Sequence, residues 1–188
     1  MERATGNCAR LETECPQGRA GSNPFETRAR SESPVEKILS PALKFKMAKK
    51  FEFLPHPADE YIVGYGRDLK EAYQNLALGL NEFMVPLKEV KLKVTKNIEV
   101  ESEDKAALAF DFLTEFLILH DSENLVFGDV KVTSLEETSK GFKLKATASG
   151  EEFDPQKHHQ GTAIKAITYH NLEIKEKPTV SIKILVDI

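Results

Sequence analysis

The hydrophobic pattern of the chain changes along its length between helical and strand-like spacing. Apolar side chains recur every three or four residues across residues 69–84 and again across residues 107–119, which predicts two helices with one buried face each. Asp68 and Asp104 stand just before these runs, where an aspartate accepts hydrogen bonds from the first free N–H groups of a helix. Ile118 widens the apolar face of the second helix, which places this helix near the centre of the core.

Most other apolar positions alternate with polar ones, as they do in strands with one buried face. The strands expected on this basis are residues 51–54, 61–65, 91–95, 97–101, 126–132, 142–148, 164–174 and 179–186. Two helices among seven or eight strands, without internal repeats, predict an α+β fold. We expect a single domain whose two main helices pack on a mostly antiparallel or mixed β-sheet.

Residues 1–46 lack both patterns and differ in composition from the rest. They hold five of the six arginines and four of the nine prolines, and their net charge is +2 against −6 for residues 47–188. Such a segment buries too little apolar surface to offset the entropy lost on ordering. We interpret residues 1–46 as a disordered or non-native N-terminal extension, and residues 47–188, beginning at Met47, as the folded domain.

Composition also narrows the class of function. No apolar run approaches the roughly 20 residues that span a bilayer, so no membrane association is expected. Cys8 and Cys15 both precede the domain, which excludes a disulfide framework for it and favours a cytoplasmic location. A net charge of −6 and the single arginine of the domain, Arg67, argue against a nucleic-acid surface. No Walker A motif, nucleophile elbow or other complete set of catalytic residues is present.

Acidic side chains stand at two places where the local structure does not require them. Asp59 and Glu60 follow His56 in an early turn, and Asp187 precedes Ile188, whose terminal carboxylate adds a second negative group. On the residues alone, a solvated turn is the simpler explanation of Asp59 and Glu60, and an ordinary edge strand with an exposed acid is the alternative for Asp187. If Asp59 and Asp187 meet, their charges repel unless a cation lies between them, and oxygen ligands suit Ca²⁺, Mg²⁺ or Mn²⁺.

A third polar segment covers residues 153–162 and leads into the strand expected at 164–174. His158 and His159 are adjacent and cannot share a helix face, and no cysteine or third suitably spaced histidine completes a zinc site. Lys165 follows this loop, where it could hold a phosphate or a carboxylate of a partner. A solvent-facing lysine on a strand is the simpler alternative.

Four strings in this order resemble the archease family. The strings are His56-Pro57-Ala58-Asp59, residues 116–121, residues 150–170 and Val186-Asp187-Ile188. Their order and separation match the family along residues 51–188, which is nearly the whole domain. Pro57 departs from the pattern, because the family usually has threonine there, and proline lacks both the hydroxyl and a backbone N–H.

The resemblance implies a small α+β protein that assists an RtcB-type RNA ligase. That ligase joins RNA ends in tRNA splicing, using GTP and a divalent metal through a guanylate bound to the ligase. An archease promotes formation of this intermediate and allows multiple turnover, so it is an activator and not an enzyme. Its links to tRNA and GTP are indirect, through the ligase.

The resemblance also assigns roles to the acidic residues. It implies that Asp59 and Asp187 form an acidic tip that binds a divalent metal ion, with calcium, magnesium and manganese as candidates. We extend the metal ligands to Asp121 and to the terminal carboxylate of Ile188. The residues expected to contact the partner are His56, Glu60 and Lys165.

Two other functions remain open on the sequence. A metal-dependent enzyme could use His56, Asp59 and Asp187 as acid, base and ligands, and it would turn over substrate without a ligase. A chaperone-like or RNA-binding module would bind tRNA or unfolded chains without a ligase, which the negative charge of the domain disfavours.

Overall fold

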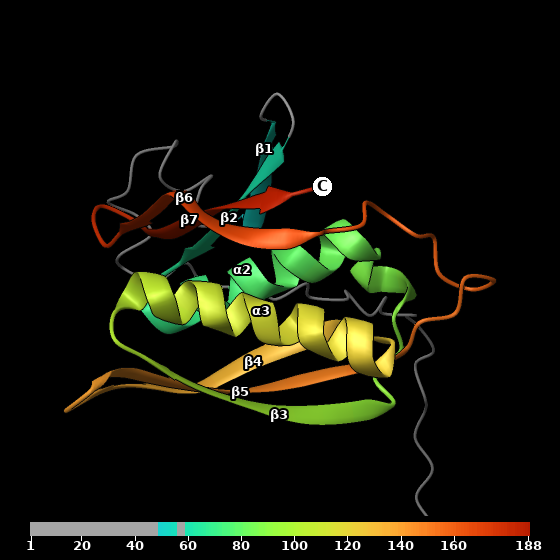
Figure 1. The fold of residues 1–188 in the computed structure, drawn as a ribbon, viewed down its shortest axis with the longest axis horizontal. Helices are drawn as coiled ribbons and strands as arrows, with labels where there is room; N and C mark the ends of the chain where they lie inside the picture. The colour runs from blue at the N-terminus through green and yellow to red at the C-terminus, as the bar shows by residue number, and fades with distance from the viewer. Residues whose placement is uncertain (1–48, 56–58) are drawn as a thin grey trace, which may run out of the picture.

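The computed structural model describes residues 49–55 and 59–188, which form three layers (Figure 1). Two helices lie between a four-stranded sheet and a three-stranded sheet. The four-stranded sheet has the order β1-β2-β7-β6, and the three-stranded sheet has the order β3-β5-β4. All strand pairs among the described residues are antiparallel, which confirms the α+β class and assigns the strands to two sheets.

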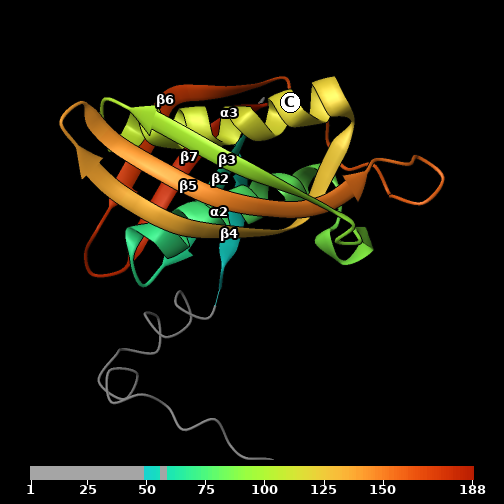
Figure 2. The ribbon, with the colours of Figure 1, turned by 90° about the horizontal axis from the view of Figure 1, so that it is seen from below.

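The elements follow one another as two strands, a helix, a strand, a helix and four strands, with a short 3-10 turn after the first helix. Figure 2 views the molecule from the side of the three-stranded sheet, which covers that face of the helices. The bounds are β1 Phe51–Pro55, β2 Asp59–Gly66, α2 Leu69–Met84, η1 Leu87–Glu89, β3 Val94–Ser102, α3 Lys105–Glu123, β4 Leu125–Thr138, β5 Gly141–Glu152, β6 Ala166–Lys175 and β7 Val180–Asp187.

Both helices begin as the sequence predicts. The Asp68 carboxylate accepts a hydrogen bond from the Glu71 N–H at 2.8 Å, and the Asp104 carboxylate accepts one from the Ala107 N–H at 2.8 Å. Each bond satisfies a donor that has no partner within the helix. At the other end of α3, Asn124 adopts a left-handed conformation with φ of 54° and closes the helix.

The core fills the space between the sheets. Its largest fully buried aromatic side chains are Tyr73, Phe112, Phe116 and Phe127. The prediction for Ile118 is wrong, because 50% of this residue is exposed. The helix α3 packs against β6 on one side and against β3 and β5 on the other, and its remaining side reaches the surface.

Two glycines let β2 lie directly on α2. A Cβ atom on Gly64 would lie 2.5 Å from the Leu76 nitrogen, and one on Gly66 would lie 2.4 Å from the Ala72 nitrogen. These glycines therefore face the helix. Because successive side chains of a strand point to opposite faces, the first residue of β2, Asp59, points away from the helices.

Candidate functional site

Asp59 and Asp187 meet across two neighbouring strands. They are directly opposite in the antiparallel pair of β2 and β7, and Ala166 of β6 lies opposite Asp187 on its other side. Directly opposite residues share one face of a sheet, with Cβ atoms about 4.5–5.5 Å apart. Both aspartates are half-buried. The fold thus brings together two carboxylates from the two ends of the domain, as the sequence-based hypothesis required.

The donor atoms of this pair fit a hard divalent cation. Like charges directly opposite in a sheet repel, and a cation between them removes that repulsion. Carboxylate and main-chain oxygens are the ligands that Ca²⁺, Mg²⁺ and Mn²⁺ prefer. Within residues 49–55 and 59–188 no group of three or more His, Cys, Asp or Glu side chains could hold a metal ion. A cation at Asp59 and Asp187 would therefore need further oxygens, such as that of Ile188.

Lys165 reaches the end of β7 with both its main chain and its side chain. Its N–H donates to the Asp187 carbonyl oxygen at 2.9 Å, and its ammonium donates to the Ile188 oxygen at 2.7 Å. The residue is exposed. The contact of Lys165 with a partner stays a prediction, and within the chain Lys165 contacts the chain end beside the aspartate pair.

The other candidate residues of the early turn divide into two groups. His56 and Pro57 lie outside the described residues. Glu60 is opposite Pro55 and Val186 and, following the alternation along β2, lies on the face of the sheet opposite to Asp59. The adjacent carboxylates of Asp59 and Glu60 therefore point to different faces.

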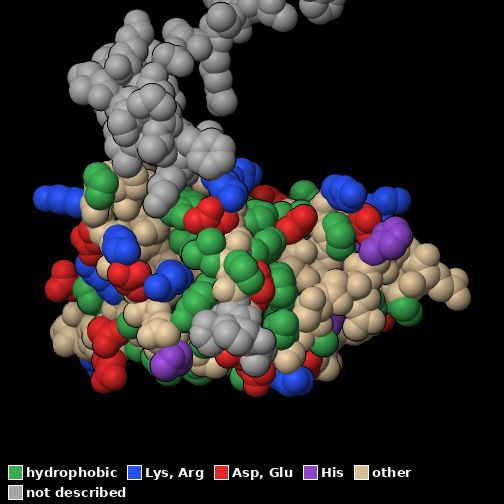
Figure 3. Space-filling model, turned by 90° about the horizontal axis from the view of Figure 1, so that it is seen from above, with side chains coloured by type: hydrophobic (Ala, Val, Ile, Leu, Met, Phe, Trp, Pro, Cys, Tyr) green, Lys and Arg blue, Asp and Glu red, His purple; other side chains and the backbone are tan. Residues whose placement is uncertain are grey.

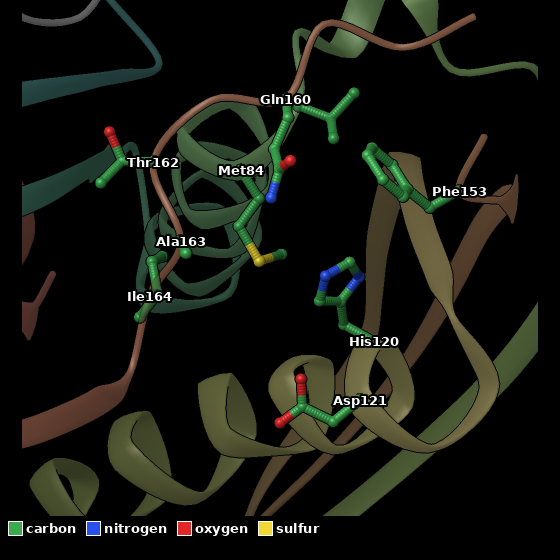
Figure 4. A pocket seen from close by; sticks show the side chains of 9 residues that line it. Met84, His120, Asp121, Phe153, Gln160, Thr162, Ala163 and Ile164 are labelled. Atoms are coloured by element: carbon green, nitrogen blue, oxygen red, sulfur yellow. The ribbon is translucent and has the colours of Figure 1, made fainter. Parts of the chain in front are cut away.

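Asp121 lies in the last turn of α3 and lines a small pocket of about 110 Å³ (Figure 4). His120 and Gln160 line the same pocket, and the His120 Nδ1 lies 3.1 Å from the Leu125 carbonyl oxygen. Asp59, Asp187 and Ile188 are not among its lining residues. Asp121 therefore lines a different part of the surface and does not join the pair of Asp59 and Asp187.

Sequence reasoning missed a buried ionic network at the start of the loop that leads to Lys165. Glu151 and His158 are each only 3% exposed. The Glu151 carboxylate accepts from the Lys91 N–H at 2.8 Å, pairs with the Lys93 ammonium at 2.7 Å, and also contacts Lys157. No local pattern marks Glu151. The alternation along β5 predicts that its side chain is exposed, because the preceding residue, Gly150, is buried.

The His158 ring is held in a defined state within this network. The Asp154 N–H donates to His158 Nδ1 at 3.0 Å, so Nε2 carries the proton and faces a Glu151 carboxylate oxygen at 3.2 Å. Burial lowers the pKa of His158 below its usual value, and the neighbouring Lys157 lowers it further. The adjacent His159 points elsewhere, to the Glu89 carboxylate at 3.0 Å.

The face that carries the aspartate pair has mixed charge. Figure 3 shows this side of the molecule, where acidic and basic side chains surround a central group of apolar ones. Because the charges are mixed, attraction of a charged partner would come from local groups such as the aspartate pair and not from a field of one sign.

No helix among the described residues is long and apolar enough to cross a membrane.

Comparison with known proteins gives one consistent result. Residues 51–188 match the family described as "Archease protein family (MTH1598/TM1083)". A protein archease of Thermococcus kodakarensis is 49% identical over 130 residues, covering 69% of this chain and 91% of that protein. A "Protein archease-like" of Dictyostelium discoideum is 40% identical over 144 residues, covering 74% and 94%. The solution structure of Methanobacterium thermoautotrophicum protein 1598 has a TM-score of 0.64 at 32% identity, covering 74% of this chain and 99% of that one.

Proposed function

This chain belongs to the archease protein family, and from that premise we propose that it activates an RtcB-type RNA ligase and is not itself the catalyst. The activation consists of promoting the guanylated ligase intermediate and allowing multiple turnover in tRNA splicing or RNA repair. The chain meets tRNA and GTP only through the ligase. The proposed setting is the cytoplasm, since the domain contains no cysteine and needs no disulfide.

The observation that carries this proposal is the position of Asp59 opposite Asp187. Two half-buried carboxylates on one face, at the ends of two adjacent strands, form a compact acidic tip that can enter a cleft. We call the group of Asp59, Asp187 and the Ile188 oxygen the acidic tip. The Lys165 contacts with Asp187 and Ile188 hold the chain end beside the pair.

The acidic tip is proposed to bind one divalent cation, Ca²⁺, Mg²⁺ or Mn²⁺. When bound, the cation would supply a compact positive charge that phosphate oxygens coordinate. The two aspartates and the Ile188 oxygen would hold it at the surface, where the metal- and nucleotide-binding cleft of a ligase can approach. Charge complementarity speeds such encounters and makes them sensitive to salt.

A guanylation assay tests the function and the site together. Purified ligase is mixed with GTP and Mn²⁺ or Mg²⁺, with and without the full chain, and formation of the ligase guanylate is measured. We compare the wild type with Asp59→Asn and with Asp129→Asn, which removes the same charge from an exposed position on β4 in the other sheet. We expect Asp59→Asn to lose about tenfold or more of the stimulation, because even the loss of a group that only supports a metal ligand commonly costs about 10–100-fold.

Each outcome has a defined meaning. Stimulation by the wild type and Asp129→Asn, lost in Asp59→Asn, supports both the function and the acidic tip. Equal stimulation by all three chains keeps the function and rejects the tip. No stimulation by any chain rejects the activator function, and turnover by the chain alone or ligase-independent tRNA binding would then identify the alternative.

A further inference from the structure

The loop before β6 carries Lys165 to the acidic tip, and main-chain hydrogen bonds fix its course. The Gly161 N–H donates to the Met84 carbonyl oxygen at 2.8 Å, and the Thr162 N–H donates to the Phe83 carbonyl oxygen at 3.1 Å. The Lys165 N–H then donates to the Asp187 carbonyl oxygen. The backbone at Lys165 is therefore held whether or not its ammonium keeps its own contact.

The ammonium of Lys165 makes a separate contact with the Ile188 oxygen at 2.7 Å. We propose that this ammonium is an internal competitor for the divalent cation of the acidic tip. In the cation-free chain it places a positive charge beside the acidic tip, and that charge opposes the binding of a cation to the same carboxylate. This inference rests on the proposed acidic tip and adds the regulation of that same site.

Geometry and charge favour this competition. Ca²⁺ lies about 2.3–2.6 Å from an oxygen ligand, and Mg²⁺ about 2.0–2.1 Å. A cation on the Ile188 oxygen would therefore lie within about 5 Å of an ammonium 2.7 Å from the same oxygen. The two positive charges repel at that separation. Lysine has a flexible four-carbon stem and no fixed fork, so its ammonium can withdraw while the backbone stays in place.

The size of the effect follows from exposure. Lys165 is exposed, and interactions between exposed charges are weak and screened by salt. We expect removal of the Lys165 charge to tighten cation binding by about two- to fivefold. If Lys165 only positions the chain end, its removal would weaken binding instead. The two roles therefore predict opposite signs.

Calorimetric titration of the full chain with Ca²⁺ and with Mn²⁺ measures the dissociation constant without any ligase. Lys165→Met removes the charge and the hydrogen bond, whereas Lys165→Gln removes the charge but keeps a donor. Both are expected to bind about two- to fivefold more tightly at about 0.1 M salt, and Lys165→Arg to bind as the wild type does. The gain is expected to shrink as sodium chloride is added, since salt screens the repulsion.

Lys183→Met is the matched control. Lys183 lies on the same strand as Asp187 but about 13 Å away, at about 3.3 Å per residue, which exceeds the screening length of about 8–10 Å at moderate salt. Its removal changes the net charge equally and is expected to leave the dissociation constant unchanged.

Weaker or unchanged binding in both Lys165→Met and Lys165→Gln overturns the competition. A wild type that binds neither cation also overturns it, even where the chain stimulates the ligase. Tighter binding in both variants, together with full stimulation by Asp59→Asn in the guanylation assay, keeps the competition and rejects the proposed role of the tip in activation. The two failures are therefore distinguishable.

Discussion

The carboxylate of Glu151 differs from those of Asp59 and Asp187 in its burial and in the charge of its neighbours. Glu151 is buried and receives hydrogen bonds and positive charge from several side chains of the protein itself. Buried charges persist in folded proteins only with such partners. The aspartates are half-buried and lie opposite a like charge. Glu151 therefore stabilises the loop before β6, whereas the aspartate pair is the proposed site of an external cation.

His158 makes the stability of the protein depend on pH. Burial lowers its pKa in the folded state, and the Asp154 N–H occupies Nδ1, so the folded chain resists protonation there. The unfolded chain, with a histidine pKa of about 6.5, binds that proton more readily. The contribution of His158 is therefore complete above about pH 6.5 and is lost as the pH falls, by up to about 1.4 kcal/mol per pH unit.

Urea unfolding between pH 7.5 and 5.5 measures this effect. The free energy of unfolding of the wild type should fall more steeply with decreasing pH than that of His158→Gln. His159→Gln removes the adjacent, exposed histidine and is expected to keep the wild-type slope. Equal slopes in the wild type and His158→Gln would contradict the assignment of His158 as a neutral buried group.

At the scale of elements, local signals predicted the helices better than the strand ends. The caps at Asp68 and Asp104 act within one turn of their own helix, so the sequence nearby contains the information. The strand expected from Lys91 instead begins at Val94 as part of β3. The Lys91 N–H is bound by the Glu151 carboxylate, a contact that no pattern near Lys91 indicates.

The contact between β2 and α2 depends on Gly64. An alanine there would place its Cβ atom against backbone atoms of Leu76. Backbone atoms within a helix cannot move aside as the end of a flexible side chain can. We expect Gly64→Ala to lower the free energy of unfolding by about 1–3 kcal/mol, the usual range for overpacking. Urea denaturation measures the change, with the exposed strand substitution Lys131→Ala as control within about 0.5 kcal/mol of the wild type. Wild-type stability in Gly64→Ala would refute the close packing.

At the scale of the whole molecule, the domain is expected to be complete without the N-terminal extension. Every buried hydrophobic residue of the described core lies at or beyond Ile62, and the family match covers residues 51–188. A chain of residues 47–188 should unfold cooperatively within about 4 °C of the full chain, the shift that 1 kcal/mol produces in a domain of this size. Differential scanning calorimetry measures both transitions.

The guanylation assay provides the functional part of the same comparison. Residues 47–188 should stimulate the ligase as the full chain does, because Asp59, Asp187 and Lys165 all lie within them. Loss of cooperative unfolding, or loss of stimulation in a chain that folds, would show that residues 1–46 contribute to the domain.

The sequence by itself determined the features that arise from neighbours along the chain. Periodicity and capping residues predicted α2 and α3, alternation predicted most of the strands, and unexplained acids singled out Asp59 and Asp187. These features depend on side chains within a few residues of one another. They can therefore be predicted from the local sequence pattern.

Only the tertiary structure decided how these parts combine. The division of the strands into two sheets, the register that sets Asp59 opposite Asp187, and the Lys165 contact with Ile188 join segments far apart in the chain. The same holds for the Glu151 network around His158. A register shift of one residue would move every side chain of a strand to the other face, and no local pattern specifies which strand lies beside which. The acidic tip is therefore a product of strand register, since it exists only where β2 and β7 pair.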